Sequence, residues 1–379
     1  MSLTTSEPPT PTPPPGPLPG RLGALCAHFY SLAINFRNRR FDRGKGVIHF
    51  DRPVISVGNL SVGGTGKTPI VQHLVKILRH AGRWPAVAMR GYRAPASQGT
   101  QSDEAQTYLS HFPDLPLVAQ PDRAAGLIQL FSTDAGERVD TIILDDGFQH
   151  RRIGREVDLV LIDATRSPFA DALLPQGWLR ESPDSLRRAS AIILTHAEAV
   201  PPAHLALLEA QVRQHAPHAL LASCQHAWSG FTLHQGNHTP GEPKTLGWLS
   251  LQRVFAACAI GNPDAFFAQA RHHCPIGLVG THAYRDHHPF TPAQADTLAL
   301  AVKASAADVL LVTAKDWAKL RTLPLRGVPC LVPTLEMSWS KGGEAIEQLV
   351  LAAKIDDEPA GPDPLESHHA HRATDGPAT

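Results

Sequence analysis

Short apolar segments alternate with longer amphipathic ones through most of the chain. Five of the apolar segments have the length and composition of buried strands: Val54–Val57, Ala86–Met89, Thr141–Leu144, Leu159–Ile162 and Ala191–Leu194. Between and after them the spacing predicts helices, one starting at Thr68 and others near 103–111, 122–131 and 202–215. Regular alternation of strands and helices is typical of an α/β fold with a parallel, doubly wound sheet.

The alternation stops once and then resumes. Residues 223–250 are rich in Gly, His, Pro and Thr, and we interpret them as a linker that includes a hairpin. Beyond it the pattern predicts two more strands and two more helices: Val254–Ile260, Ala265–Arg271, Pro292–Ala304 and Val309–Thr313. We therefore expect two α/β parts, residues 46–222 and 251–354, joined by the linker 223–250.

A separate amphipathic segment, residues 21–41, precedes the first strand. Its large apolar residues recur at helical spacing: Leu22, Leu25, Phe29, Leu32 and Phe36. Arg37, Arg39 and Arg40 follow, and the uncharged run is shorter than the roughly 20 residues that span a bilayer. Two interpretations stay open, a helix packed on the protein and a helix lying at a membrane surface, where arginines meet anionic lipid heads.

Composition narrows the classes of function. Lys plus Arg and Asp plus Glu both total 35 of 379 residues, so no overall charge favours nucleic-acid binding, and we predict no nucleic-acid partner. The five cysteines lack metal-site spacing and are typical of a reducing compartment. The terminal segments 1–20 and 355–379 are rich in Pro and polar residues, so we expect disordered tails.

The strongest chemical motif follows the first predicted strand. It is a glycine-rich loop opening into a helix, and its nucleotide-binding residues would be Ser61, Val62, Gly63, Gly64, Thr65, Gly66, Lys67 and Thr68. Glycines let backbone N–H groups surround phosphate oxygens at a helix N-terminus. Lys67 can reach the β- and γ-phosphates, and the Thr68 hydroxyl can bind Mg²⁺. The motif predicts a P-loop that binds ATP and Mg²⁺.

Two adjacent carboxylates supply a partner for this loop. Asp145 and Asp146 follow the strand Thr141–Leu144, and strand ends of this kind form the ligand-binding edge of an open α/β sheet. A carboxylate at this edge commonly holds Mg²⁺, directly or through water. We predict that Thr68, Asp145 and Asp146 form the metal site.

Two further clusters are ambiguous from the residues alone. Asp103 and Glu104 could cap a helix and favour its dipole, or could act chemically. Asp286, His287 and His288 could form a metal cluster, a hydrogen-bonded loop or an acid–base pair. Neighbouring histidines rarely point at one metal, so the metal interpretation is the weakest of the three.

Taken together, these motifs resemble the tetraacyldisaccharide 4'-kinase family, the lipid A kinases of Gram-negative bacteria. The resemblance covers roughly residues 20–335 and rests on VGNLSVGGTGKTP (57–69), RGY (90–92), DE (103–104), DR (122–123), ILDDGFQH (143–150), LRE (179–181), GNPDAFF (261–267), DHHPFT (286–291) and TxKD (313–316). The chain departs from the family at Ala314, where members commonly have Glu.

The resemblance implies a function and a location. Members phosphorylate the 4'-hydroxyl of a tetraacylated disaccharide 1-phosphate with ATP, as peripheral proteins at the cytoplasmic face of the bacterial inner membrane. It implies a P-loop-like fold of two α/β/α lobes with a short stranded linker and the active site between the lobes. It also favours membrane contact by the 21–41 helix. We infer no obligate protein partner.

The resemblance also assigns roles to residues. Asp103, paired with His287, would be the base for the sugar hydroxyl, a role that suits an alcohol whose pKa lies far above 7. Asp145 and Asp146 match the Mg²⁺-associated pair, and Lys67 and Thr68 match the phosphate and metal contacts. Further positions near the nucleotide or substrate are matched by Arg123, His150, Arg180 and Glu181.

Two other functions fit the P-loop alone. A switch ATPase of the partitioning or metallochaperone type would share the GGTGKT sequence, but position 62 is Val rather than the signature lysine of that class. A soluble small-molecule kinase would leave the arginine-flanked apolar helix without a purpose. We therefore predict the lipid kinase, with the switch ATPase as the alternative.

Overall fold

The computed structural model describes residues 15–91, 103–236, 241–261, 263–274, 277–286 and 288–354. One predicted catalytic residue, His287, lies outside these ranges. The other, Asp103, is described only as the first residue of a helix and not in its side chain. The predicted tail 355–379, and most of the predicted tail 1–20, also lie outside the described residues.

The described strands form one mixed sheet that is mostly parallel. Its order is β10-β9-β11-β12-β7-β6-β5-β1-β4-β2-β3, and β8 pairs with β7. The first six strands along the chain are β1 (Val54–Asn59), β2 (Pro85–Met89), β3 (Leu117–Ala119), β4 (Thr141–Asp145), β5 (Val157–Asp163) and β6 (Ala191–Thr195). The later strands are β7 (Leu220–His234), β8 (Glu242–Lys244), β9 (Val254–Cys258), β10 (Leu278–Ala283), β11 (Val309–Val312) and β12 (Cys330–Lys341). The α/β fold predicted from the sequence is confirmed.

Helices cover the sheet and connect its parallel strands. The larger half of the sheet, which contains β1 to β6, carries α2 (Lys67–His80), α3 (Asp103–His111), α4 (Arg123–Phe131), α5 (Asp134–Glu137), α6 (Pro202–His215) and α11 (Gly343–Leu351). The other half carries α7 (Leu246–Leu249), α8 (Pro263–His273), α9 (Pro292–Ala304) and α10 (Ala314–Leu320), and short 3₁₀ turns span Pro168–Ala170, Pro183–Arg188 and Ala197–Ala199. Each strand and helix that the sequence pattern predicted is present, with ends shifted by a few residues.

Burial explains why the predicted strands are continuous apolar runs. Every residue of β1, β2, β4 and β6 is buried, because helices pack on both faces of a parallel sheet. On one face α2 inserts Ile70, Leu74 and Leu78 into the core beside β1. The two elements that flank the P-loop, β1 and α2, are therefore both anchored in the core.

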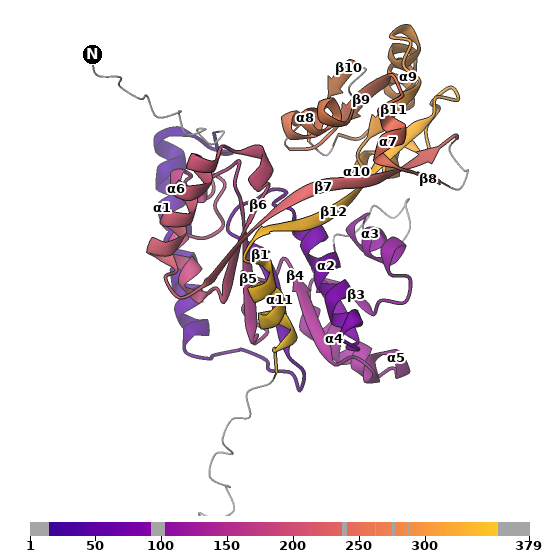
Figure 1. Cartoon of the computed structure of the whole chain (residues 1–379). Coiled ribbons are helices and arrows are strands. Elements are labelled where there is room, and N and C mark those ends of the chain that lie inside the picture. Colours follow the sequence, from indigo (N-terminus) through magenta and orange to yellow (C-terminus); the bar gives the residue numbers. More distant parts are fainter. Residues whose placement is uncertain are drawn as a thin grey trace, which may run out of the picture.

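A long antiparallel ribbon joins the two halves of the sheet. It consists of β7 and β12, which pair from Ser223 opposite Lys341 to His234 opposite Cys330. The start of β7 pairs with β6, and the start of β12 pairs with β11, so each strand belongs to a different half (Figure 1). The stretch expected to be a linker thus contains most of β7 together with β8 and α7. Division of the chain into two domains stays a prediction.

The N-terminal helix α1 (Gly20–Asp42) lies along one side of the larger half (Figure 1). Its five large apolar residues, from Leu22 to Phe36, remain between 53% and 78% exposed. Its buried residues are Gly23, Ala27 and Asn38. A helical stripe of this size normally faces a core, so α1 presents an unusual apolar surface.

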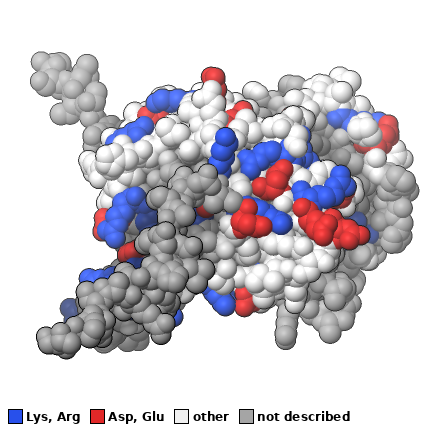
Figure 2. Space-filling view, turned by 90° about the horizontal axis from the view of Figure 1, so that it is seen from below, with Lys and Arg blue, Asp and Glu red and all other residues white. Residues whose placement is uncertain are grey.

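The described helices and surface add two observations. None of the helices in the described ranges combines the length and apolar content needed to cross a bilayer. On the face of the molecule that Figure 2 shows, basic and acidic side chains lie interspersed. That face carries no extended area of one charge among its described residues, in keeping with the balanced totals of the sequence.

Candidate functional site

The P-loop connects the carboxyl end of β1 to α2. Gly66, the residue before α2, has φ 75°, and Gly63 has φ 130°, conformations that residues with a Cβ rarely adopt. Gly63 and Gly64 are exposed at the tip of the loop. The free N–H groups of the first helical turn and the positive end of the helix therefore meet at this loop, the arrangement that binds phosphate.

Neighbouring segments hold the loop from two sides. The Val62 N–H donates to the Trp178 carbonyl at 2.8 Å, and Ser61 forms an antiparallel bridge with Leu179. From the other side the Thr195 hydroxyl, at the end of β6, donates to the Thr65 carbonyl at 3.1 Å. These hydrogen bonds hold the shape of the P-loop without a bound nucleotide.

Asp146 lies between two cations beside the P-loop. Its Oδ1 is 3.5 Å from Lys67 Nζ, and both carboxylate oxygens accept from Arg180 Nη1 at 2.8 Å. Burial alone would raise the pKa of Asp146, but the charges of Lys67 and Arg180 outweigh it and hold that pKa below its usual value. The residue has φ 53°, a strained conformation for a non-glycine residue. Such strain persists only where surrounding contacts enforce it.

Asp145, the last residue of β4, is buried beneath the same edge of the sheet. Its Oδ2 accepts a hydrogen bond of 2.9 Å from the hydroxyl of Tyr108, which is fully buried in α3. The same helix begins at Asp103. Tyr108 therefore ties the helix of the predicted base to the predicted metal carboxylate.

Arg123 and His150 lie near the Asp146 backbone. Arg123, almost completely buried at the start of α4, donates to the Asp146 carbonyl at 3.1 Å. Burial lowers the pKa of His150 to about 4, and the positive charge of Arg123 adds to this effect. His150 is therefore neutral near pH 7 and cannot serve there as a charged donor.

Glu181 is fully buried behind Arg180. Its Oε2 accepts from Asn38 at 2.8 Å, from Ser185 at 3.0 Å and from Arg188 at 3.0 Å. A carboxylate so completely enclosed has no contact with solvent in this conformation. The structure thus places Glu181 as a support of the neighbouring segment rather than at its surface.

The structure brings most of the predicted site residues together. Lys67, Arg123, Asp146 and Arg180 form one contact network next to the P-loop. Asp145 adjoins Asp146 in sequence, and His150 lies within the electrostatic reach of Arg123. Asp103 and His287 cannot be placed relative to this network, because their side chains are outside the described part of the structure.

Two residues of the site were not predicted from the sequence. They are Tyr108, which holds Asp145, and Thr195, which holds the P-loop. Thr195 could have been found, because it directly follows the predicted strand Ala191–Leu194, at the same edge of the sheet as Asp145. Tyr108 carried no signal, since a tyrosine in an amphipathic helix is most often part of a core.

The donor set fits Mg²⁺ better than a softer metal. Carboxylates of Asp145 and Asp146 and the hydroxyl of Thr68 are hard oxygen ligands. Mg²⁺ sites in P-loop proteins draw their remaining ligands from phosphates and water, so they need no dense cluster of protein ligands. Over the described ranges, no group of three or more His, Cys, Asp or Glu residues is placed to hold a metal.

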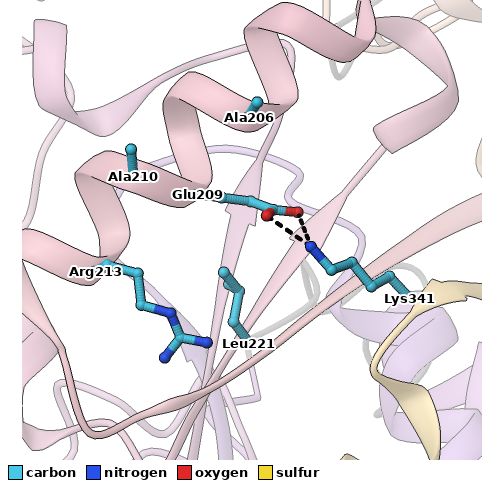
Figure 3. A pocket seen from close by; sticks show the side chains of 6 residues that line it. All are labelled: Ala206, Glu209, Ala210, Arg213, Leu221 and Lys341. Carbon is cyan, nitrogen blue, oxygen red and sulfur yellow. Dashed lines mark hydrogen bonds and ion pairs between the residues drawn. The ribbon is translucent and has the colours of Figure 1, made fainter.

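A separate hollow lies between α6 and the strands β7 and β12 (Figure 3). Inside it Lys341 pairs with Glu209 at 2.8 Å, and Arg213 donates to the Ala219 carbonyl. Leu221, also in its lining, sits near the amino end of β7. P-loop chemistry occurs at the carboxyl ends of the parallel strands, so this hollow is not part of the candidate site.

Fold and site together define a class of protein. The loop from β1 to α2, with an acidic strand end and basic side chains beside it, is that of a P-loop nucleotide-binding protein with an α/β fold. The family model described as Tetraacyldisaccharide-1-P 4'-kinase matches residues 21–353. The chain belongs to this family.

Individual relatives agree with the family assignment. The chain is 33% identical over 309 residues to Tetraacyldisaccharide 4'-kinase of Bdellovibrio bacteriovorus, covering 78% of this chain and 87% of that protein. It is 33% identical over 337 residues to the protein of the same name from Geobacter sulfurreducens, covering 84% and 89%. Among solved structures it is similar to LpxK from Aquifex aeolicus in complex with ATP, with 25% identity, a TM-score of 0.63, and coverage of 86% and 96%.

Proposed function

We propose that this chain transfers the γ-phosphate of ATP to the 4'-hydroxyl of tetraacyldisaccharide 1-phosphate. The observation that carries the proposal is the cluster of Lys67, Asp146 and Arg180 at the mouth of a P-loop, in a member of this kinase family. A P-loop alone would suit many nucleotide-binding proteins. Family membership supplies the acceptor, and the solved ATP complex of a relative supports ATP as the donor.

Positioning and charge would carry most of the catalysis. Phosphoryl transfer spreads negative charge over the transferred group, and cations that are already in place stabilise that charge without reorganisation. Lys67 stands next to the loop where the β- and γ-phosphates would bind. Arg180 contacts the Asp146 carboxylate and Arg123 contacts the Asp146 carbonyl, and both would add positive charge to the site.

Mg²⁺ would be held by the hydroxyl of Thr68 and the carboxylates of Asp145 and Asp146. When bound, it would neutralise charge on the β- and γ-phosphates. Tyr108 would orient the Asp145 carboxylate through the hydrogen bond already present. Arg180, which contacts both oxygens of Asp146, would orient the second carboxylate.

Asp103, paired with His287, would accept the proton of the sugar hydroxyl. The start of α3 at Asp103, and the bond from Tyr108 of that helix to Asp145, support a position near the phosphate site. A positioned carboxylate assists proton removal as the new P–O bond forms.

The exposed apolar stripe of α1 supports the proposal of peripheral attachment to a membrane, and the family resemblance implies the cytoplasmic face of the inner membrane. Arg37 and Arg40, at the end of the helix, line a hollow with Arg152 and could contact anionic lipid heads. A lipid with four acyl chains leaves a bilayer only at a cost of about 0.8 kcal/mol per CH₂ group. An enzyme that acts on it must therefore reach the membrane surface.

Incubation of the protein with ³²P-labelled ATP and tetraacyldisaccharide 1-phosphate tests the proposal. The expected product is the same lipid bearing a second phosphate, formed only when acceptor, ATP and Mg²⁺ are all present. Release of phosphate at the same rate without the lipid acceptor would instead support a switch ATPase. No phosphorylated lipid at any Mg²⁺ concentration would refute the lipid kinase.

Replacing Asp103 with Ala tests the proposed base. We expect Asp103→Ala to lower turnover by roughly 10²-fold or more, the range typical of general base catalysis, with ATP affinity close to that of the unchanged protein. Turnover under saturating substrates and ATP binding by calorimetry are the two measurements. Unchanged turnover would remove Asp103 from the mechanism.

A further inference from the structure

The two faces of α1 contact different surroundings. Leu22, Phe29 and Phe36 lie on one face and are exposed, whereas Asn38 lies on the opposite face of the same helix and Tyr30 at its edge, by the 100° step between residues. The Tyr30 hydroxyl donates to the Arg180 carbonyl at 3.0 Å, and the Asn38 amide donates to Glu181 Oε2 at 2.8 Å. The inward face of α1 is therefore joined to the pair Arg180–Glu181.

The segment Trp178–Glu181 lies between α1 and the P-loop. On its loop side, the Arg180 N–H donates to the Leu60 carbonyl at 2.7 Å, and the Trp178 carbonyl accepts from Val62. From this segment the Arg180 side chain reaches both oxygens of Asp146. Movement of the segment would therefore move the P-loop entrance and the Asp146 carboxylate together.

A second connection runs from α1 to the chain that follows Asp146. Arg151 donates to the Asn38 carbonyl at 3.1 Å and pairs with Asp42 Oδ1 at 2.8 Å. Arg151 is five positions beyond Asp146 in the sequence. Asn38 thus contacts both segments that flank the Asp146 carboxylate, one through its side chain and one through its backbone.

We propose that Asn38 is a positioning residue for phosphoryl transfer, which holds Glu181 and thereby keeps Arg180 aligned on Asp146. Tyr30 acts on the same segment through the Arg180 carbonyl. The inference rests on the proposed function, since Asp146 matters here as a carboxylate that serves Mg²⁺ and phosphate. It adds a helix outside the sheet to the residues that shape the site.

The chemistry of the contact explains why an asparagine suits this position. Glu181 Oε2 accepts three hydrogen bonds, and its buried carboxylate would be costly with fewer donors. Asn38 supplies a neutral donor to Oε2, whereas the charge of Glu181 is balanced by Arg188 at 3.0 Å and by Arg37 at 3.6 Å from Oε1. Loss of that donor would leave Glu181 free to turn toward other cations and would loosen the segment that carries Arg180.

Asn38→Ala and Tyr30→Phe test the proposal in the full chain. Tyr30→Phe removes a single hydroxyl from a half-buried ring, so it should fold even if Asn38→Ala is unstable. The matched control is Asn35→Ala, on the same helix, because Asn35 is exposed and its amide contacts Ser31. Thermal denaturation of each variant reports folding separately.

Two measurements are made on each variant. The first is turnover of tetraacyldisaccharide 1-phosphate at saturating ATP. The second is ATP affinity by calorimetry, once with Mg²⁺ and once in EDTA, with Asp146→Asn as the reference for loss of the carboxylate. We expect Asn38→Ala to lower kcat roughly tenfold and to reduce the gain in affinity that Mg²⁺ provides, because small misplacements of catalytic groups have effects of this size. Affinity in EDTA should stay unchanged.

The outcomes separate positioning from general stabilisation. Values for Asn38→Ala and Tyr30→Phe equal to those of Asn35→Ala would overturn the proposal, as would an equal loss of ATP affinity with and without Mg²⁺. If the unchanged protein does not phosphorylate the lipid, the proposed function fails, and the Mg²⁺-dependent affinities alone decide the role of Asn38. If Asp146→Asn keeps the full gain in ATP affinity that Mg²⁺ provides, the assignment of Asp146 to the metal fails. The turnover of Asn38→Ala and Tyr30→Phe relative to Asn35→Ala then decides the role of Asn38.

Discussion

At the residue scale, the site is organised around the carboxylate of Asp146, whose backbone is strained. Asp146 accepts from Arg180 through both oxygens and lies 3.5 Å from Lys67, so it is held ionised between two cations before any nucleotide binds. Phosphate oxygens arriving at the P-loop would compete with Asp146 for Lys67. Because Arg180 would keep its contact, Asp146 would stay in place while Lys67 turns to the phosphates.

His150 provides a test of electrostatics at this scale. Its pKa is lowered from 6.5 to about 4, chiefly by burial and then by Arg123. Between pH 6.5 and pH 4, His150 is protonated in the unfolded chain but remains neutral in the folded protein. The contribution of His150 to the free energy of unfolding is therefore highest above pH 6.5 and decreases as the pH falls toward 4. Relative to a His150→Gln variant, the protein should lose roughly 1 kcal/mol between pH 7 and pH 5, allowing for partial solvent screening.

Denaturant unfolding of both proteins at pH 7 and pH 5 measures this difference. Changes at other titrating groups cancel in the comparison, because the two chains differ at one residue. The same variant should leave the pH dependence of turnover between 6.5 and 8 unchanged, since His150 is neutral throughout that range. A stability difference that does not move with pH would show that His150 takes up its proton normally.

Sequence patterns identified some of these residues and could not identify others. Lys67 and Asp146 were predicted from local motifs, because phosphate and metal chemistry restricts residue types within a few positions. Arg180 was indicated only by family resemblance, since its partner Asp146 is 34 positions away and no spacing rule links them. Asn38 gave no signal, because one buried amide on an amphipathic helix resembles any other polar residue.

At the element scale, the turn into α2 depends on glycine. Gly66 has φ 75° immediately before Lys67, a conformation that costs a residue with a Cβ roughly 1 kcal/mol or more. Gly66→Ala should therefore lower the free energy of unfolding by about that amount and weaken ATP binding at least tenfold, since the loop would no longer present its N–H groups correctly. Gly82→Ala is the matched control, because Gly82 has φ 79° in a turn away from the loop.

Calorimetric ATP binding and denaturant unfolding distinguish the two glycines. Both variants should lose similar stability, but only Gly66→Ala should lose affinity. Equal affinity in the two variants would mean that the backbone of this turn does not shape the nucleotide site.

The elements differ in how far their sequences predict them. Fully buried strands such as β1 and β4 are unbroken apolar runs, so the pattern finds them directly. The ribbon strand β7 mixes Gly230 and several histidines and serines with its buried positions, and its partner β12 lies about a hundred residues further on. Long-range pairing of this kind leaves no local periodicity, so the sequence predicted a hairpin within 223–250 but neither the full length of β7 nor β12.

At the scale of the whole molecule, α1 connects a surface suited to lipid with the interior of the kinase site. Its outward stripe has no partner in the described structure, while its inward face contacts the segments on both sides of Asp146. Deletion of the helix would therefore remove both roles together. Substitutions restricted to the outward face can separate them.

The double variant Phe29→Ser, Phe36→Ser removes two large side chains from the outward face of α1. Transfer of each phenylalanine side chain from water to an apolar environment is favourable by about 2 kcal/mol. Binding of the double variant to vesicles that contain anionic lipid should therefore fall at least tenfold. Both rings are mostly exposed, so the thermal midpoint should barely change. Leu251→Ser is the matched control, because Leu251 is 71% exposed and lies outside α1.

Sedimentation with vesicles and turnover of an acceptor dispersed in detergent give the two readouts. The inward contacts of Tyr30 and Asn38 remain in the double variant, so turnover in detergent should stay within about twofold of the unchanged protein. Full sedimentation of the double variant would show that another surface binds the membrane. A large loss of turnover in detergent would show instead that the apolar face also binds the acceptor itself, because no vesicle is present to account for the effect.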